Sequence, residues 1–496
     1  MSASIVGVDG VPVRVEVDVA FGLPGLTIVG LAGSAVLEAR ERVRAALRNS
    51  GFEVPSRRIT INLAPADLPK EGTGHDLAMA TAILVASDQL DGAGLARAAL
   101  IGELALDGSL RPVPGALALV SAARGAGVDE AIVPAENADE CAAIGGLVIR
   151  SAGSLRQVTR HLAGIELLDE RAPSAPVRAD TPADAPDLAS VIGQAVGRRA
   201  LEVAVAGRHN IAFTGPPGVG KTLLARAAAG LLPPLGEDEA AEVSRIHSVA
   251  GALDRHAGLT LRRPFRAPHH TISTQALVGG GPRIRPGEAS LAHRGALFLD
   301  EALQFRADAL DALRGPLDAG WVHIARVDGV LVLPARFMLI AAYNPCACGW
   351  SGVPGHECRC DDGARRRYQA RLSGPMRDRI DLVVHLEPVL LAAHRRTSEP
   401  SEIVAARIAE ATRIQVERQG LPNAELDAGM IGRAIGFDSR LIDLLHARGR
   451  RMALSLRRLH RAARVARTIA DLAEDERVRI EHLDEALQHR AREAAA

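Results

Sequence analysis

The stretch Gly215-Pro216-Pro217-Gly218-Val219-Gly220-Lys221-Thr222 has residue types and a spacing that suit phosphate chemistry. It matches the full G-x-x-x-x-G-K-[ST] pattern of a Walker A loop. An apolar run before it and an alanine-rich run after it predict the strand–loop–helix context that this motif requires. Its backbone N–H groups would bind phosphate, Lys221 would reach the β- and γ-phosphates, and the Thr222 hydroxyl would hold Mg²⁺. The motif predicts ATP and Mg²⁺ as cofactors.

Two further apolar runs end in polar residues that suit ATP hydrolysis. The run 296–299 ends in Asp300 and Glu301, the pattern of a Walker B strand. Asp300 would orient the Mg²⁺ shell, and Glu301 would polarise the attacking water. The run 337–342 leads to Asn344, which suits a sensor that hydrogen-bonds the water or the γ-phosphate, or alternatively a residue that caps a turn.

Four of the five cysteines lie together after that sensor, as Cys346, Cys348, Cys358 and Cys360. Four thiolates can close a tetrahedral structural zinc site, and His356 is a substitute ligand. Free buried thiols or a redox pair are the alternatives. The fifth cysteine, Cys141, is expected in a hydrophobic core.

Composition sets wider limits. A chain of 496 residues predicts two to four domains, and its zero formal net charge means that any nucleic acid must bind local patches. We find no signal-peptide pattern and no apolar run long enough to span a membrane. The clustered cysteines argue against a secreted disulfide framework, so we expect a cytoplasmic protein. The chain has only two lysines, Lys70 and Lys221.

Hydrophobic periodicity divides the chain into four segments. Residues 1–165 alternate between strands and helices as an α/β domain does, and the Pro-, Ala- and Asp-rich residues 166–187 predict a linker. Residues 188–390 predict a nucleotide-binding core, and residues 391–496 predict helices. The clearest expected elements are strands at 13–19, 58–63 and 131–134, helices at 34–49, 76–87 and 456–472, and a hairpin of 321–326 with 330–333.

Residues 69–76 and 102–115 resemble the Lon proteolytic domain, whose catalytic dyad is a serine and a lysine. The serine position falls on Gly74, and the lysine position falls within 116–119, which contains no lysine. Without a nucleophile and a base there is no covalent peptide hydrolysis, so we expect a Lon-like fold that is not a protease. Lys70 stands where Lon carries a lysine beside its active-site loop; a surface lysine in a turn is the alternative.

Four blocks, at 264–273, 279–281, 286–293 and 344–346, follow one another in the nucleotide segment. With the Lon-like front and the C-terminal segment, they resemble the ComM/YifB family, the magnesium-chelatase-like AAA+ ATPases. The resemblance covers essentially the whole chain. It implies an AAA+ P-loop core with a parallel sheet, a C-terminal helical lid, and a homo-hexamer with ATP sites at subunit interfaces. It also implies a link to DNA, because a member acts as a branch-migration helicase in natural transformation.

The resemblance assigns roles to several basic residues. Arg379 stands where the family has an arginine, and we expect it to be the finger that enters the neighbouring subunit's nucleotide site. Arg377 is its rival, and surface salt bridges with nearby aspartates are the alternative. Arg457 matches the sensor-2 position that reaches the γ-phosphate from the lid. The interval 440–467 has nine arginines against one acid, which suits contact with phosphates or solvated helix faces paired elsewhere.

Candidate DNA contacts come from the same analogy. The hairpin residues His323 and Arg326, and the segment with Arg266, His269 and His270, would face the pore of the ring.

These expectations combine into a ring-forming ATPase that couples ATP hydrolysis to movement on branched or single-stranded DNA, as in recombination or natural transformation. A remodelling ATPase of the magnesium-chelatase type, acting on a protein partner, is the main alternative; the Lon-like front and the cysteine cluster oppose it. An ATP-dependent protease is a third, and the absent serine and lysine oppose it.

Overall fold

A computed structural model of the chain forms two compact units, which are described one at a time. The first comprises Met1–Arg178, Gly236–Leu261 and Ile284–Pro286, and the second Ala179–Leu235, Arg262–Arg283 and Gly287–Ala496. Among the described residues, no helix is both long and apolar enough to cross a membrane. The structure describes residues 1–172, 185–253, 258–281, 284–326, 329–388, 398–427, 429–430, 436, 439–452 and 454–491.

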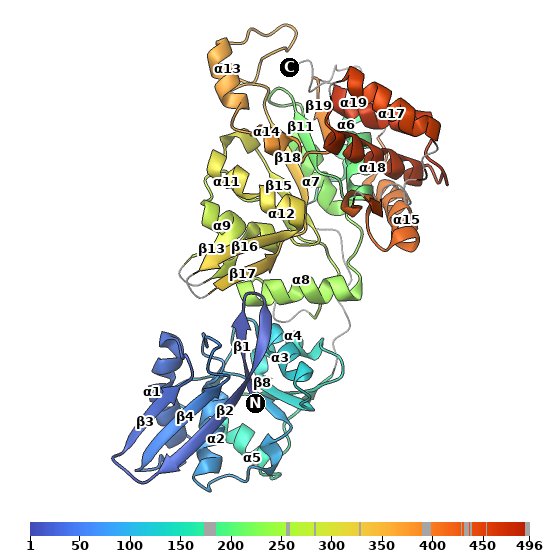
Figure 1. The fold of residues 1–496 in the computed structure, drawn as a ribbon. Helices are drawn as coiled ribbons and strands as arrows, with labels where there is room; N and C mark the ends of the chain where they lie inside the picture. The colour runs from blue at the N-terminus through green and yellow to red at the C-terminus, as the bar shows by residue number, and fades with distance from the viewer. Residues whose placement is uncertain are drawn as a thin grey trace. The chain divides into compact units, whose positions relative to one another are not determined.

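The first unit contains two four-stranded sheets (Figure 1). One has the order β1-β2-β4-β3 and is antiparallel except between β3 and β4. Alternate residues Ile59, Ile61 and Leu63 of β4 are buried, as in a strand with one face on a core. The bounds are β1 Ser2–Val6, β2 Asp9–Ala20, β3 Gly25–Val29 and β4 Arg58–Ala64.

The second sheet has the order β10-β9-β8-β5. Its strands β5, β8 and β9 are parallel, and β10 is antiparallel to β9. The predicted linker begins too early, because β10 (Glu170–Arg171) lies inside 166–187 and pairs with Ile149 and Arg150. The other bounds are β5 Ala98–Leu100, β8 Glu130–Pro134 and β9 Val148–Ala152, and a small pair is formed by β6 Glu103–Leu104 and β7 Leu110–Arg111.

Helices of the first unit differ in how much they bury. Helix α1 (Ser34–Asn49) buries one apolar face, whereas α2 (Asp76–Ala86) is apolar on nearly all sides and lies in the core. The two are joined by an ion pair from Arg42 Nε to Asp76 Oδ2 at 2.7 Å. The remaining helices are α3 Ala116–Gly125, α4 Ala138–Ala142 and α5 Leu155–Leu162.

Helix α8 (Glu237–Ala250) also belongs to the first unit, although it lies within the nucleotide segment of the sequence. Ser248 donates from Oγ to Glu140 at 2.7 Å and accepts from the Gly115 N–H at 3.0 Å, and Arg245 pairs with Asp9 at 3.0 Å. The predicted boundaries, 1–165 and 188–390, assign α8 to the nucleotide segment. Helix periodicity shows that α8 has an apolar face but not which unit that face packs against.

The second unit is built on a five-stranded parallel sheet of order β12-β15-β18-β11-β19 (Figure 1). This confirms the predicted parallel core. Strand β11 lies between β18 and β19, so it is buried on both sides, and Ile211, Ala212 and Phe213 are fully enclosed. The bounds are β11 Ile211–Thr214, β12 Phe265–Arg266, β15 Ala296–Leu299, β18 Met338–Tyr343 and β19 Leu382–His385.

Helices surround this sheet and share its core. Ile408 of α15 and Leu459, Ala462 and Ile469 of α18 belong to the same hydrophobic cluster as Phe213 of the sheet. The predicted helical C-terminal region is therefore packed on the nucleotide core. The helices are α6 Ala195–Gly207, α7 Lys221–Ala227, α9 Thr274–Val278, α10 Glu288–Leu291, α11 Ala307–Ala312, α12 Arg314–Ala319, α13 Asp362–Gln369, α14 Gly374–Arg377, α15 Ser401–Gln419, α17 Ser439–Arg451, α18 Leu456–Leu472 and α19 Ile480–Ala491.

The predicted hairpin is confirmed as β16 (Trp321–Arg326) paired antiparallel with β17 (Gly329–Pro334). The two central turn residues of the prediction, 327 and 328, lie outside the described residues, as does the side chain of Arg326.

Candidate nucleotide-binding site

The chemistry-bearing residues gather at one edge of the parallel sheet. Strands β15, β18 and β11 are adjacent and parallel, so their carboxyl ends meet there. The phosphate loop follows β11, Asp300 follows β15 and Asn344 follows β18. Ligands of open α/β sheets bind at this edge, so the topology assembles a site from segments more than 120 residues apart.

Lys221 lies at the centre of this edge. Its ammonium donates to the backbone carbonyls of Gly215 and Pro216, both at 2.7 Å, and to Asn344 Oδ1 at 2.9 Å. Desolvation lowers the pKa of Lys221 to about 8, although the nearby carboxylates Asp300 and Glu301 raise it. The lysine is thus held by oxygen atoms within reach of the loop that would cradle phosphates.

The phosphate loop has the backbone that its glycines permit. Gly218 and Gly220 have φ of 79° and 90°, in the left-handed region that favours glycine. The Gln194 amide braces the loop by donating to the Val219 carbonyl at 3.1 Å. Beyond the loop, Thr222 Oγ1 donates to Asp300 Oδ2 at 3.0 Å. Hydroxyl and carboxylate oxygens are the ligands Mg²⁺ prefers, so these residues fit a magnesium nucleotide.

Glu301 lies beside the same edge and is exposed, with 61% of its side chain accessible. Its φ of 50° is unusual for a residue other than glycine and turns the chain sharply after β15. His270 Nδ1 lies 3.9 Å from the Glu301 carboxylate. Spacing along the chain does not predict this neighbour, because His270 lies on a different segment and only the pairing of β12 with β15 brings the two together.

The segment predicted to contact DNA lies partly in this same region. Arg266 makes a two-pronged ion pair with Glu288, at 2.7 and 2.8 Å, so its charge is matched within the chain. The rings of His269 and His270 are 4.1 Å apart. The structure therefore places His270 next to the candidate catalytic carboxylate.

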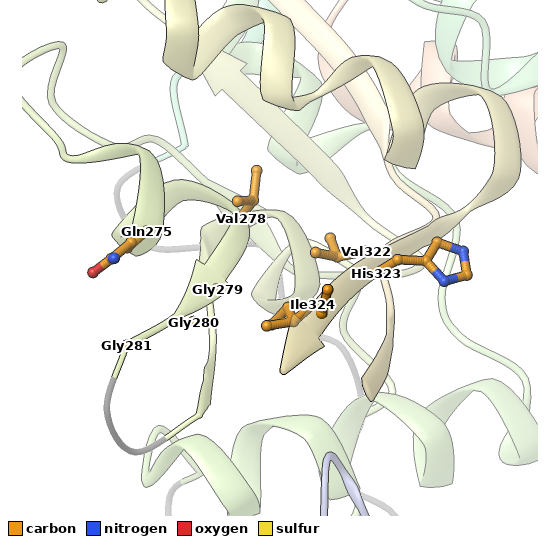
Figure 2. Close-up of a pocket in the computed structure, with 9 residues that line it drawn as sticks. Gln275, Val278, Gly279, Gly280, Gly281, Val322, His323 and Ile324 are labelled. Carbon is orange, nitrogen blue, oxygen red and sulfur yellow. The ribbon is translucent and has the colours of Figure 1, made fainter. Parts of the chain in front are cut away.

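The hairpin residue His323 is exposed. Beside β16 lies a pocket of about 520 Å³, lined by Gly279–Gly281 and by Val322 and Ile324. Figure 2 shows that the His323 ring points away from the three glycines, while Val322 and Ile324 lie between. His323 also lines this pocket, but alternation along the strand turns its ring away from the three glycines.

Arg379 and Arg457 lie at the opposite, amino edge of the sheet. The Arg379 guanidinium is buried in an ion pair with Asp318, and Arg457 Nη2 lies 3.3 Å from the same carboxylate. The Arg379 carbonyl accepts from Asn210 Nδ2 at 2.8 Å, and Asn210 immediately precedes β11. The five residue steps from Asn210 to Gly215 span about 16 Å. Neither arginine reaches its own phosphate loop in this arrangement.

Arg377, the rival for the finger role, has another environment. It donates from Nη2 to the Gln369 carbonyl at 2.6 Å and from Nε to the Leu372 carbonyl at 3.1 Å. These bonds satisfy carbonyls at the end of α13, a structural task for a cation near a helix C-terminus.

The four clustered cysteines converge as predicted. Sγ–Sγ distances are 3.4 Å for Cys346–Cys348, 3.7 Å for Cys346–Cys358 and 3.6 Å for Cys348–Cys358, and all four sulfurs lie within 4.8 Å of one another. A tetrahedral zinc site with ordinary Zn–S bonds has sulfurs about 3.8 Å apart. The thiols are free, not paired in disulfides, and therefore fit a divalent metal ion. The His356 ring stacks on Trp350 at 4.0 Å. Cys141 is buried, as expected.

In the first unit, Gly74, at the serine position of the Lon dyad, lies beside the segment 116–119 that contains the lysine position. A Cβ on Gly74 would be 3.5 Å from Leu119 Cδ1. Lys70 is fully buried and donates to the Pro65 carbonyl, which excludes a surface lysine in a turn. His75 is also buried, with Nδ1 2.9 Å from the Ser2 hydroxyl.

Comparison with known proteins agrees with this architecture. Residues 187–393 match the family described as magnesium chelatase, subunit ChlI, residues 15–137 match the subunit ChlI of Mg-chelatase, and residues 398–490 match the ChlI C-terminal family. The fold and site thus define a magnesium-chelatase-like AAA+ ATPase, a class that uses ATP and Mg²⁺.

The full-length relatives narrow this class. The chain is 44% identical to the uncharacterized protein YifB of Salmonella typhimurium, over 98% of this chain and 95% of the relative. It is 41% identical to the competence protein ComM of Haemophilus influenzae, over 99% and 96%. A Lon protease of Salinispora arenicola matches 27% of the chain, at 28% identity, over 18% of its own length. The chain belongs to the ComM/YifB family of magnesium-chelatase-like proteins.

Proposed function

We propose that this chain is one subunit of a ring-forming ATPase that couples ATP hydrolysis to movement on DNA. The observation that carries the proposal is the separation of two sets of residues by the length of β11. Lys221, Thr222 and Asp300 lie at the carboxyl edge, and Arg379 and Arg457 lie at the amino edge. A ring with head-to-tail contacts brings opposite edges of neighbouring subunits together.

In this arrangement each residue has a distinct task. Lys221 and the loop N–H groups bind and orient the β- and γ-phosphates. Thr222 and Asp300 would hold Mg²⁺, which would supply neutralising charge for the transferred phosphoryl group. Glu301 orients and polarises the attacking water, and Asn344 hydrogen-bonds that water or the γ-phosphate. Arg379 and Arg457, from the next subunit, stabilise the charge on the γ-phosphate; a finger supplied this way contributes about 10³–10⁵ in rate.

Asp318 has a part in this scheme as the internal partner of both arginines. The carboxylate is about 30% exposed and neutralises Arg379 and Arg457 within the single chain. On assembly, the neighbour's γ-phosphate would replace Asp318 as the anion that both arginines bind. The alternative finger, Arg377, already uses its guanidinium to satisfy two backbone carbonyls.

DNA as the partner is supported by the relative named competence protein ComM and by the exposed hairpin. We propose His323 and Arg326 of β16 as the principal DNA contacts. Arg266, His269 and His270 are weaker candidates, because Arg266 is paired with Glu288 and His270 lies beside Glu301. We also propose that Cys346, Cys348, Cys358 and Cys360 bind one structural zinc ion.

The test is steady-state ATPase activity of the full chain alone and with single-stranded, forked and four-way DNA. The proposal predicts strongest stimulation by branched or single-stranded DNA, and loss of that stimulation in His323→Ala with basal turnover retained. ATPase activity that ignores every DNA structure but responds to a protein partner would instead support a remodelling ATPase of the magnesium-chelatase type.

A further inference from the structure

The segment that contains the four cysteines, residues 346–360, begins and ends close to the nucleotide site. Cys346 follows the sensor Asn344 by two residues, and Asn344 Oδ1 accepts the hydrogen bond from Lys221 Nζ at 2.9 Å. Cys360 precedes α13 by two residues. Whatever holds the four sulfurs together therefore fixes both the chain leaving Asn344 and the chain entering α13.

Helix α13 returns to the same sensor. Its residue Tyr368 is buried. The next residue, Gln369, donates from Nε2 to the Pro345 carbonyl at 3.2 Å. The cysteine segment is thus tied back, through α13, to Pro345, the residue after the sensor Asn344.

The middle of the segment touches the phosphate loop directly. Gly349 has a φ of 86°, and a Cβ added there would lie 2.7 Å from Pro217 Cδ and 3.8 Å from Asn344 Cγ. That separation from Pro217 is closer than real Cβ atoms approach, so the glycine backbone lies against the Walker A proline with no room for a side chain. Movement of this segment therefore shifts Pro217 and, with it, the phosphate loop.

The segment has little hydrophobic anchoring of its own. Between Cys346 and Cys360 the buried residues are few, with Val353 as the buried aliphatic side chain, and Cys348, Cys358 and Cys360 are partly exposed. A short irregular loop without a core needs another constraint to stay in one conformation. Four thiolates on one metal ion supply such a constraint.

We propose that metal bound by the four cysteines is a positioning element of the nucleotide site: it holds residues 346–360 so that Asn344 and Pro217 keep the phosphate loop and Lys221 in their binding arrangement. Metal occupancy then controls ATP binding and turnover. This inference rests on the proposed nucleotide site but is independent of DNA and of ring formation, since every contact in it lies within one subunit.

The test measures metal, nucleotide binding and loop protection on the same full-length protein. Zinc content is measured by mass spectrometry before and after chelation, binding by a fluorescent ATP analogue, and protection of residues 215–222 by hydrogen exchange. Removal of zinc is expected to weaken nucleotide binding about tenfold or more and to increase exchange in 215–222, with zinc readdition restoring both. Cys358→Ser should do the same, whereas Cys141→Ser, which changes a core residue of the first unit, should not.

A second variant tests the contact with the phosphate loop without removing the metal, in case metal loss unfolds the segment. Gly349→Ala retains all four thiols and should retain zinc, yet it should weaken nucleotide binding and raise exchange in 215–222, because its Cβ displaces Pro217. The inference is overturned if the metal-free protein binds nucleotide and protects 215–222 like the wild type, or if the purified protein has no metal and four freely titratable thiols. Failure of DNA to stimulate turnover would count against the motor and leave these readouts unaffected.

Discussion

The two lysines of the chain occupy opposite kinds of environment. Lys221 lies at the open edge of the parallel sheet, half-buried, with an ammonium held by Gly215, Pro216 and Asn344. Lys70 is fully enclosed in the first unit and donates to the Pro65 carbonyl. All other cationic side chains of the Lys/Arg type in the chain are arginines. Lys221 lies where a ligand can reach it, and Lys70 is buried in a core.

The difference shows that residue type alone does not define a site. Both lysines have desolvation as the first cause of a lowered pKa, and both follow a loop rich in glycine or proline. Lys221 is joined by Thr222, Asp300 and Asn344, which suit phosphate and Mg²⁺. Lys70 is joined by His75, and the serine position of the Lon dyad holds Gly74, which packs against Leu119.

The largest expected effect is at Lys221. Lys221→Ala should abolish productive ATP binding, and Lys221→Arg should also lower turnover by at least about 100-fold, because a planar guanidinium cannot replace a compact ammonium among three converging oxygens. Binding of a fluorescent ATP analogue and steady-state turnover measure this. Wild-type turnover in either variant would reject the phosphate-loop assignment.

An intermediate effect is expected at Lys70, on stability instead of activity. Lys70→Ala removes a buried hydrogen bond and part of the core, so the first unit should lose about 1–3 kcal/mol. Amide exchange in β4 and α2 reports this loss, while nucleotide binding by the second unit should not change. Lys70→Met keeps the aliphatic stem and separates packing from charge. If Lys70→Ala lost nucleotide turnover while its amide exchange stayed unchanged, Lys70 would act in turnover, as Lys221 does, and not in stability.

The smallest effect concerns His75 and pH. Burial, and next the nearby Lys70 charge, lower the pKa of His75 to about 4, well below its ordinary 6.5. Between those values the unfolded chain binds a proton that the folded chain does not. Stability is therefore complete above pH 6.5 and falls as the pH drops toward 4, by about 1.4 kcal/mol per pH unit.

Amide exchange in α2 at pH 6.5 and 5.5 measures this loss. His75→Asn keeps a hydrogen-bonding partner for Ser2 and does not titrate, so its stability should fall less over the same interval. Equal slopes in the two proteins would mean that His75 is accessible to protons in the folded state.

Much of the fold could be predicted from periodicity. Helices at Ser34–Asn49 and Leu456–Leu472 agree with their expected bounds, because each has a continuous pattern and clear ends. The return of α8 to the first unit could not be predicted, because its partners Gly115 and Glu140 are far away in the sequence.

The candidate site divides in the same way. Lys221, Thr222, Asp300 and Asn344 come together as expected, since each directly follows or borders a strong strand signal. The position of His270 beside Glu301, and the shared use of Asp318 by two arginines, depend on tertiary contacts that spacing does not encode.

The measurement that tests the central claim most directly is complementation between two inactive variants. Arg379→Ala should bind ATP almost normally but not hydrolyse it, and Lys221→Ala should not bind it. In an equal mixture with verified subunit exchange, about a quarter of interfaces combine an intact Lys221 with an intact Arg379 from the next subunit. The account predicts recovery of ATPase activity toward that fraction of wild type, with an Arg377→Ala mixture run beside it to identify the finger. Activity that stays at the level of the single variants in both mixtures would contradict sites shared between subunits.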